Sequence, residues 1–402
     1  MRGVSIHDAS SRLVTLAGVS YFTIDGIVGY NHIGHGIALQ NGAEMNNLIQ
    51  NNLILGTYPS YSNEESDTEP SSIWITHPTN TIINNVVGGS EADGISYDIK
   101  LRSDGESASP FVCPRGAPTS IQSNLAHSNK RAGLRVSKLY PSTLTCRPIV
   151  DPTLLNPWGL ATLNPLSPIT VSNITAHGNG FGVWIGDVAA LSISNVQVAD
   201  CSMAGIRVDS TNTSQNNITL TNANIVGQTA SSNPGQTVGT PMFGLVTPRA
   251  NWIQLTAVQL VNFASYMTAF QVWSDCHLAS VQSLGAKYIY TSNVSYSNVL
   301  GPYVSWNGPA QYLNFLNADN TSTSPFNSDT RTVNQLVPYF PHNDVAGVCS
   351  NATTFASWNA LVCSATPTNP VRTISIVSAT SNDFNNPFQG AQMNIKLLSS
   401  AT

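Results

Sequence analysis

The chain repeats one short phrase five times between residues 25 and 208: an Asn or Asp, a variable stretch, then Gly followed by two apolar residues one position apart. The distance from the Asn or Asp to the Gly is nine residues in three copies, ten in another and eleven in the first. A phrase repeated at a nearly fixed offset is typical of a solenoid, in which each copy forms one coil. The copies begin at Asp25, Asn85, Asn124, Asn173 and Asn195.

Each copy ends in an apolar alternation with the period of a β-strand, which places two side chains on one face. A single coil cannot bury that face, whereas stacked coils bury it in a continuous column. An Asn at one corner predicts a ladder of side-chain amides along the axis. The sequence therefore predicts an all-β fold, a right-handed parallel β-helix; a β-sandwich is the alternative, because its strands alternate in the same way. The apolar pairs are Ile37/Leu39, Ile95/Tyr97, Leu134/Val136, Val183/Ile185 and Ile206/Val208.

The phrase is lost beyond about residue 300. We therefore expect a β-helix over 1–300 and a carboxy-terminal cap or small appended β-structure over 301–402. Long inserts separate the expected strands, and inserts in a solenoid gather on one side, often where ligands bind. These inserts span 57–72, 98–119, 137–168 and 209–216.

Composition indicates an extracellular protein. Only 9% of the 402 residues are charged, against roughly a quarter in an ordinary soluble domain, so neutral polar side chains or attached sugars must keep the surface soluble. Six Asn-x-Ser/Thr acceptors for N-glycosylation are present, at Asn173, Asn212, Asn217, Asn293, Asn320 and Asn351. The six cysteines allow 15 disulfide pairings. Pairs Cys349–Cys363 and Cys113–Cys146 close the most local loops.

The sequence contains no 18-residue apolar run, so we expect no membrane span. Its start, MRGVSIHDAS, lacks a charged segment followed by an apolar one, so no signal segment is expected there. Because strand-like sequence begins almost at once, we expect the chain to be a fragment of a larger secreted protein or of the ectodomain of a membrane protein.

Basic residues concentrate between residues 100 and 147, where eight of the 16 Lys and Arg lie with only Asp104 and Glu106 opposing them. This segment predicts a basic patch that attracts an acidic glycan, or else two long solvated loops. Nucleic acid is not an expected partner, because the chain has a pI near 5.8 and no nucleic-acid-binding signature.

Several runs resemble the β-helix region of a known family. The order and spacing of VGYNHIGHGIALQNGAEMNN (28–47), WITHPTNTIINNVVGGSEADGISY (74–97) and SNLAHSNKRAGLRV (123–136) are similar to those of the cell-migration-inducing hyaluronidase, its transmembrane relative and the fibrocystins. The likeness covers about residues 3–210. It implies a large secreted or membrane-tethered protein that either cleaves hyaluronan or acts as a receptor-like ectodomain.

The chain departs from that pattern in ways that bear on activity. We do not expect the glycine-rich amino-terminal domain of the family within these residues, and Gln40 and Asn41 stand where relatives tend to carry an acidic pair. The resemblance therefore leaves two functions open. One is a β-helix that binds, and with the missing domain hydrolyses, an acidic polysaccharide of the hyaluronan type; the other is a non-catalytic fibrocystin-like scaffold.

Glycoside hydrolysis requires two carboxyl groups that flank the bond, one as acid and one as base or nucleophile. Glu91 and Asp93 in the turn GGSEADG are candidates, with Glu44 joining them from a neighbouring coil; the alternative is a solvated or cation-binding turn. His35 and His77 are candidate acids or bases, or else hydrogen-bonded turn residues.

Candidate substrate-binding residues complete the expected site. His127, Arg131 and Arg135 could hold a sugar carboxylate, the arginines by a bidentate clamp, and Trp184 could stack on a sugar ring. No Cys/His spacing indicates zinc, and no cofactor is expected with certainty. The acidic loop with Glu64, Glu65, Asp67 and Glu69 offers hard oxygen ligands suited to Ca²⁺, but it lacks the spacing of an EF-hand.

Overall fold

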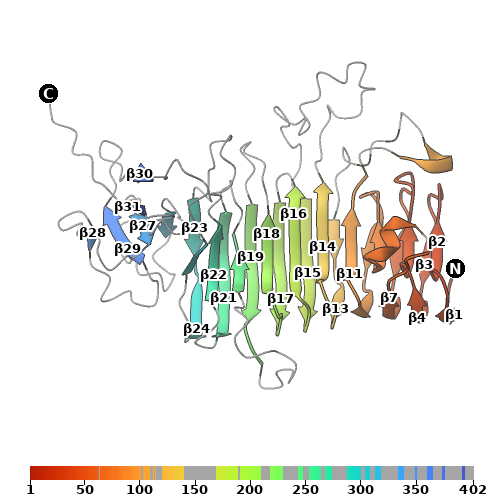
Figure 1. The fold of residues 1–402 in the computed structure, drawn as a ribbon, viewed down its shortest axis with the longest axis horizontal. Coiled ribbons are helices and arrows are strands. Elements are labelled where there is room, and N and C mark those ends of the chain that lie inside the picture. The colour runs from red at the N-terminus through yellow and green to blue at the C-terminus, as the bar shows by residue number, and fades with distance from the viewer. Residues whose placement is uncertain are drawn as a thin grey trace, which may run out of the picture.

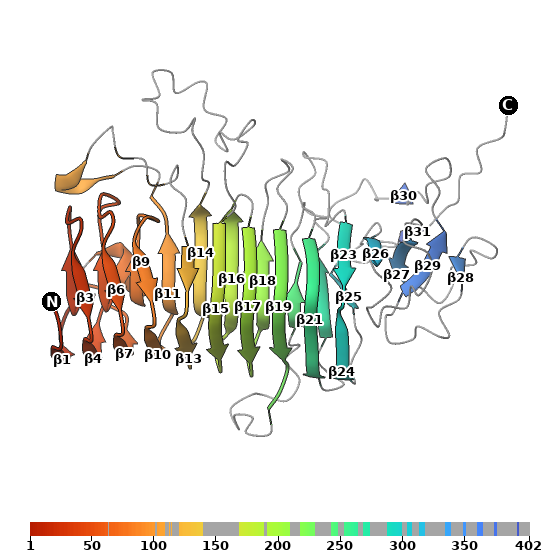
Figure 2. The ribbon, with the colours of Figure 1, turned by 180° about the vertical axis from the view of Figure 1, so that it is seen from behind.

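In the computed structural model the chain winds as an elongated stack of β coils with β1 at one end (Figures 1 and 2). The structure describes residues 1–62, 64–100, 103–108, 112, 114, 120–139, 169–188, 191–209, 218–229, 243–247 and 253–263, and further strands between residues 268 and 393. The only helices in these parts are two short 3-10 turns, η1 (Glu65–Thr68) and η2 (Gly105–Ser107). None of the described helices is long and apolar enough to cross a membrane.

The smaller of two long sheets receives one strand from each coil, and all of its strands are parallel. Parallel pairing between successive coils confirms the predicted parallel β-helix and disagrees with a β-sandwich, which pairs its strands antiparallel. In order the strands are β2 (Val14–Leu16), β5 (Ile37–Leu39), β8 (Ser71–Ile75), β11 (Asp93–Asp98), β14 (Ala132–Leu139), β16 (Phe181–Val188), β18 (Ala204–Asp209), β20 (Phe243–Val246), β22 (Thr268–Trp273) and β25 (Val304–Asn307).

The larger sheet forms the rest of each coil. The early coils contribute two short strands each, separated by a tight corner: β3 (Thr23–Asp25) and β4 (Val28–Ile33), β6 (Leu48–Gln50) and β7 (Leu53–Tyr58), β9 (Thr81–Ile83) and β10 (Val86–Ser90), and β12 (Ser120–Gln122) and β13 (Leu125–His127), after β1 (Ser5–Ala9). Later coils carry the corner inside one strand: β15 (Ile169–His177), β17 (Leu191–Ala199), β19 (Ile218–Val226) and β21 (Ile253–Phe263). β23 (Tyr288–Ser292) and β24 (Ser295–Val299) are again separate.

The Gly of each repeated phrase lies where neighbouring coils approach most closely. A Cβ on Gly133 would lie 2.8 Å from the carbonyl oxygen of Gly182, and a Cβ on Gly182 would lie 2.6 Å from that of Gly205. Because the obstructing atoms are backbone, no side-chain movement can relieve the clash. The apolar pairs that follow these glycines line the continuous core as predicted, with each member 0 or 1% exposed.

The structure contains an Asn ladder, but not all of the asparagines that begin the repeated phrases belong to it. Asn52, Asn85 and Asn124 form a buried ladder, in which Asn52 Nδ2 donates to Asn85 Oδ1 (2.8 Å) and Asn85 Nδ2 to Asn124 Oδ1 (3.1 Å). The next coil places Ile174 at this buried position, and Asn173 lies one residue earlier, on the outside. The ladder ends there because an apolar side chain replaces the amide.

Parallel pairing extends beyond the predicted boundary at residue 300, to β26 (Leu313–Asn317), which pairs parallel with β23. Antiparallel strands follow: β27 (Asn334–Pro338), β28 (Cys349–Ser350), β29 (Ala360–Ser364) and the small pair β30 (Ile374–Ser375) and β31 (Gln392–Met393). The division into two domains remains a prediction.

The cysteines give a mixed outcome. Cys349 and Cys363 are direct register partners of β28 and β29, a backbone pairing that suits the predicted disulfide. Cys113 and Cys146 lie outside the described residues. Cys201 is fully buried, and its Sγ lies 3.5 Å from the carbonyl oxygen of Ala199.

Candidate functional site

A row of polar and aromatic side chains runs along the outside of the smaller sheet, one residue from each coil. We call Trp74, Ser96, Arg135, Trp184 and Arg207 the outer row; they are successive register partners of β8, β11, β14, β16 and β18. The strand alternation that sends Val183 and Ile185 into the core sends Trp184 outward, as the sequence predicted. Trp184 is partly exposed, and it packs with Phe181 and Phe243 on the outer face.

Trp184 lies between two arginines. The guanidinium carbons of Arg135 and Arg207 are each 5.2 Å from the centre of the indole ring, within cation–π range. Asp209 orients the group, because its Oδ2 accepts from Trp184 Nε1 (2.9 Å) and from Arg207 Nε (2.7 Å). The other oxygen, Asp209 Oδ1, is buried and accepts no hydrogen bond from the described residues.

Arg131 and Arg135, predicted together as a carboxylate clamp, have different roles. Arg131 does form a bidentate clamp, but its partner is Asp93 of the protein itself: Nε and a terminal nitrogen each donate to Asp93 at 2.8 Å. Arg131 also contacts Glu69. Burial acts to lower the pKa of Arg131, but Asp93 and, to a smaller extent, Glu69 raise it above its ordinary value. Arg135 lies 3.5 Å from Asp93 and donates no hydrogen bond to any described residue, so its donors remain available.

The other basic residues of the cluster that the structure describes are also paired with carboxylates, contrary to the expectation of a basic patch. Carboxylates from the same or the preceding coil face them: Lys130 pairs with Glu91, Lys138 with Asp98 and Lys100 with Asp104. The charge count between residues 100 and 147 included Asp104 but missed Glu91 and Asp98, because stacking brings together residues about 40 positions apart, as in Lys138 and Asp98. Arg102, Arg115 and Arg147 lie outside the described residues.

Glu44 is fully buried and stabilises a turn. Its carboxylate accepts from the backbone N–H groups of Gly18 (2.8 Å), Asn41 (3.0 Å) and Gly42 (2.9 Å). The hydroxyl of Thr76 also lies 3.4 Å from Glu44 Oε2. A carboxylate whose oxygens are occupied by backbone donors is suited to fixing a loop rather than to meeting a substrate.

The three candidate carboxylates do not converge on one open groove. Asp93 pairs in register with Ser71, the first residue of β8, whereas Glu44 contacts Thr76, just beyond its last residue. Five residues along a strand span about 16 Å. Asp93 is moreover 0% exposed beneath Arg131, and Glu91 pairs with Lys130. Glu44 therefore does not join Glu91 and Asp93 of the GGSEADG turn, contrary to the prediction from the sequence.

The candidate histidines occupy different positions in their coils. His35 precedes β5, where its Nδ1 accepts from the backbone of Ser71 (2.9 Å) and its ring stacks on Trp74. His77 follows β8 and its Nδ1 contacts Thr79 (2.9 Å). His127 ends β13, on the larger sheet, and stacks on His177. Burial lowers the pKa of His35 to about 3 and that of His77 to about 4, so both are neutral near pH 7.

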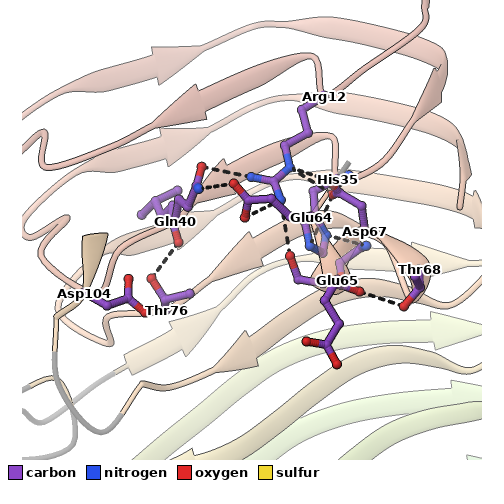
Figure 3. Close-up of polar contacts among 12 residues, drawn as sticks. Arg12, His35, Gln40, Glu64, Glu65, Asp67, Thr68, Thr76 and Asp104 are labelled. Atoms are coloured by element: carbon purple, nitrogen blue, oxygen red, sulfur yellow. Dashed lines mark hydrogen bonds and ion pairs between the residues drawn. The ribbon is translucent and has the colours of Figure 1, made fainter. Parts of the chain in front are cut away.

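The acidic insert folds over the amino-terminal end of the smaller sheet through Arg12 (Figure 3). Arg12 Nε donates to both oxygens of the buried Asp67 (2.9 and 3.1 Å), and a terminal nitrogen reaches Glu64 (3.3 Å). Asp67 also accepts from the backbone N–H of His35 (3.0 Å). Among the described residues no group of three or more His, Cys, Asp or Glu is placed to hold a metal ion. Binding of Ca²⁺ by this loop stays a prediction.

Sequence reasoning missed Arg12, Arg207 and Asp209. Arg12 lies far from its partners in the chain, 55 residues from Asp67. Arg207 and Asp209 occupy the strand that aligns with Trp184, so the repeat register itself carried a signal for them. Placing the five phrases under one another aligns Arg135, Trp184 and Arg207 in one column.

Comparison with known proteins shows that the amino-terminal coils are similar to a known β-helix family. Residues 1–134 match the CEMIP beta-helix family. The resemblance inferred from the sequence is therefore confirmed for these coils. Human fibrocystin-L is 25% identical over 272 residues, which cover 65% of this chain and 6% of that protein. Human cell surface hyaluronidase CEMIP2 is 31% identical over 166 residues, which cover 34% of this chain and 12% of CEMIP2.

The chain thus spans a small fraction of the length of these relatives. Among solved structures, the A-module of the Azotobacter vinelandii mannuronan C-5 epimerase aligns with a TM-score of 0.38 at 15% identity, covering 76% of this chain and 71% of that one.

Proposed function

We propose that this CEMIP-type β-helix is part of an extracellular protein and binds an acidic polysaccharide of the hyaluronan type on the outer row, around Trp184, without cleaving it on its own. The observation that carries the proposal is Arg135. Its guanidinium is held over Trp184, is 24% exposed and donates no hydrogen bond within the described residues. A guanidinium offers five N–H donors in a geometry that matches a carboxylate.

The spacing of the row suits a polymer. Arg135 and Arg207 lie two coils apart on either side of Trp184, which corresponds to about 9.5 Å along the axis. A sugar ring that stacks on the exposed part of the indole would have a guanidinium on each side. The name of the relative CEMIP2, a cell surface hyaluronidase, supports this class of ligand.

Binding without cleavage is supported by the state of the carboxylates. General acid catalysis needs a carboxyl group that reaches the substrate oxygen. Asp93 is clamped by Arg131, Glu44 by backbone donors and Glu91 by Lys130. Hydrolysis by a larger protein that contains further domains remains a separate prediction.

Titration of hyaluronan oligosaccharides into the full chain tests the proposal. We expect Arg135→Ala and Trp184→Ala each to weaken binding about tenfold, which corresponds to about 1.4 kcal/mol. Binding should also weaken with salt, since the contact is partly ionic. Lys138→Ala is the matched control: it removes one positive charge from the same strand, at an ion pair on the surface.

The scaffold alternative makes the opposite prediction. A fibrocystin-like ectodomain that does not use this face would give the same affinity, or none, for the wild-type chain and for Arg135→Ala. Equal losses in Arg135→Ala and Lys138→Ala would mean that only the overall charge attracts the polymer, which would contradict a specific site.

A further inference from the structure

One corner of the larger sheet presents an exposed column of residues in the left-handed backbone conformation. Register places Ser123, Asn173, Asn195 and Asn222 at successive levels of this corner, all with φ between 53° and 56°. The three asparagines are exposed. Asn tolerates this conformation better than most residues, so the backbone accounts for Asn in the column without any other role.

The hydrogen bonds along the column have one direction. Asn222 Nδ2 donates to Asn195 Oδ1, and Asn195 Nδ2 donates to Asn173 Oδ1, both at 3.2 Å. Asn173 is the last acceptor, because the preceding coil has Ser123 in its place. Its own Nδ2 donates to no described residue, and the two hydrogen bonds of the ladder form without it.

Asn173 is also the member of this trio that carries an acceptor sequence. Asn173-Ile174-Thr175 has the required hydroxyl, whereas Asn195-Val196-Gln197 and Asn222-Ala223-Asn224 do not. The buried ladder lacks the motif throughout, since Ile54, Val87 and Ala126 follow its asparagines at the second position. The motif thus coincides with the Asn of this column whose Nδ2 donates no hydrogen bond to a described residue.

We infer that Asn173 carries an N-linked oligosaccharide. In the modification the Nδ2–C1 bond forms as the bond from C1 to the diphosphate of a lipid-linked oligosaccharide breaks; Nδ2 loses one proton and the diphosphate leaves with the electron pair. The inference rests on the extracellular location proposed above, because the donor is met during export. It does not require that the chain bind a glycan.

The position is compatible with the folded coils and with the outer row. The Oδ1 of a glycosylated Asn still accepts, so the bond from Asn195 persists. Asn173 lies on β15 of the larger sheet, whereas Trp184 lies on β16 of the smaller one. A glycan at Asn173 therefore leaves the Trp184 face open. Asn293 has the same motif, and Asn212, Asn217, Asn320 and Asn351 lie outside the described residues.

The test is to produce the full chain behind a cleavable leader in a mammalian secretory line and to map its glycopeptides by mass spectrometry. We expect Asn173 to be occupied in the secreted protein. Asn173→Gln and Thr175→Val should each remove that glycan, while Asn195→Gln leaves it in place. Enzymatic removal of the glycan should leave the midpoint of thermal unfolding unchanged within error.

A second variant separates the structural argument from the motif alone. Gln197→Thr creates an acceptor at Asn195, whose Nδ2 is already a ladder donor. We expect a glycan there to lower the unfolding midpoint and the secreted yield relative to wild type. Secreted, folded protein with Asn173 wholly unmodified would overturn the inference, and loss of hyaluronan binding would not affect it. Unchanged stability with a glycan at Asn195 would overturn the ladder argument.

Discussion

At the scale of single residues, the glycine of each phrase has the clearest physical cause. A Cβ added to Gly133 would lie within 3 Å of the Gly182 carbonyl oxygen and of Asn179 Nδ2. The coils must stay about 4.8 Å apart to keep their hydrogen bonds, so the backbone cannot yield. The repeat pattern revealed these positions because the requirement recurs at every level.

Gly133→Ala should destabilise the fold by about 1–3 kcal/mol, the usual cost of overpacking a close contact. Gly186→Ala is the control, because its Cβ would meet only Trp184 Nε1, at 3.9 Å. Denaturant unfolding of both variants measures the difference. Equal midpoints would contradict the close-approach explanation.

The same scale explains which site residues the sequence could not assign. Glu44 and His35 lie in the conspicuous run from residue 28 to 47, but their roles depend on backbone contacts. Glu44 accepts from the N–H groups of Gly18, Asn41 and Gly42, and His35 accepts from that of Ser71. A backbone N–H that lies 26 residues away leaves no trace in the pattern. Trp184 was predictable, because strand alternation alone decides that it faces outward.

At the scale of elements, stacking replaces local charge patterns with ion pairs between coils. Arg131 on the approach to β14 neutralises Asp93 at the start of β11, and it also contacts Glu69 beyond η1. Such pairs join three segments of the chain. Sequence separation hid them, and the described basic residues of the cluster other than Arg135 pair mainly with carboxylates of the chain itself.

Arg131→Ala should cost about 3 kcal/mol of stability, because it leaves the fully buried Asp93 without its clamp. Arg135→Ala should cost less, since that side chain donates no hydrogen bond to the described residues. Urea midpoints compare the two. If Arg135→Ala destabilises the chain more than Arg131→Ala, the assignment of structural and ligand-binding roles is reversed.

At the scale of the whole molecule, buried histidines predict an acid-labile fold. Burial lowers the pKa of His32 and His77 to about 4 and of His35 to about 3, from an ordinary value of 6.5. Below about pH 6.5 these histidines therefore bind protons in the unfolded chain but stay neutral in the folded chain. The free energy of unfolding should fall as the pH drops from about 6.5 towards 4.

His32 isolates this effect, because both ring nitrogens are buried without a partner in the described residues. Its share of the loss by pH 4 is about 3 kcal/mol. His32→Leu should reduce the slope of stability against pH over this window, measured from urea midpoints. A variant that retains the wild-type slope would show that His32 does not titrate on unfolding.

The fold as a whole was more predictable than its surface. Every coil needs a Gly where its neighbour approaches closely, so the repeated phrase indicated the architecture. This held even though the Asn residues that begin the phrases occupy different positions at the corner. The outer row depends on register between coils, which the sequence implies only after the strands are correctly stacked. Contacts from the inserts, such as Arg12 with Asp67, follow no repeat and could not be anticipated.

The central claim is that the Trp184 face binds an acidic polysaccharide and that the chain does not cleave it. Size-exclusion chromatography with light scattering, applied to hyaluronan incubated with the full chain at low salt, reports both points at once. We predict that the polymer elutes with bound protein and keeps its length, and that Trp184→Ala reduces the amount of protein that co-elutes. Shortened hyaluronan, or a polymer that elutes without protein, would contradict the account.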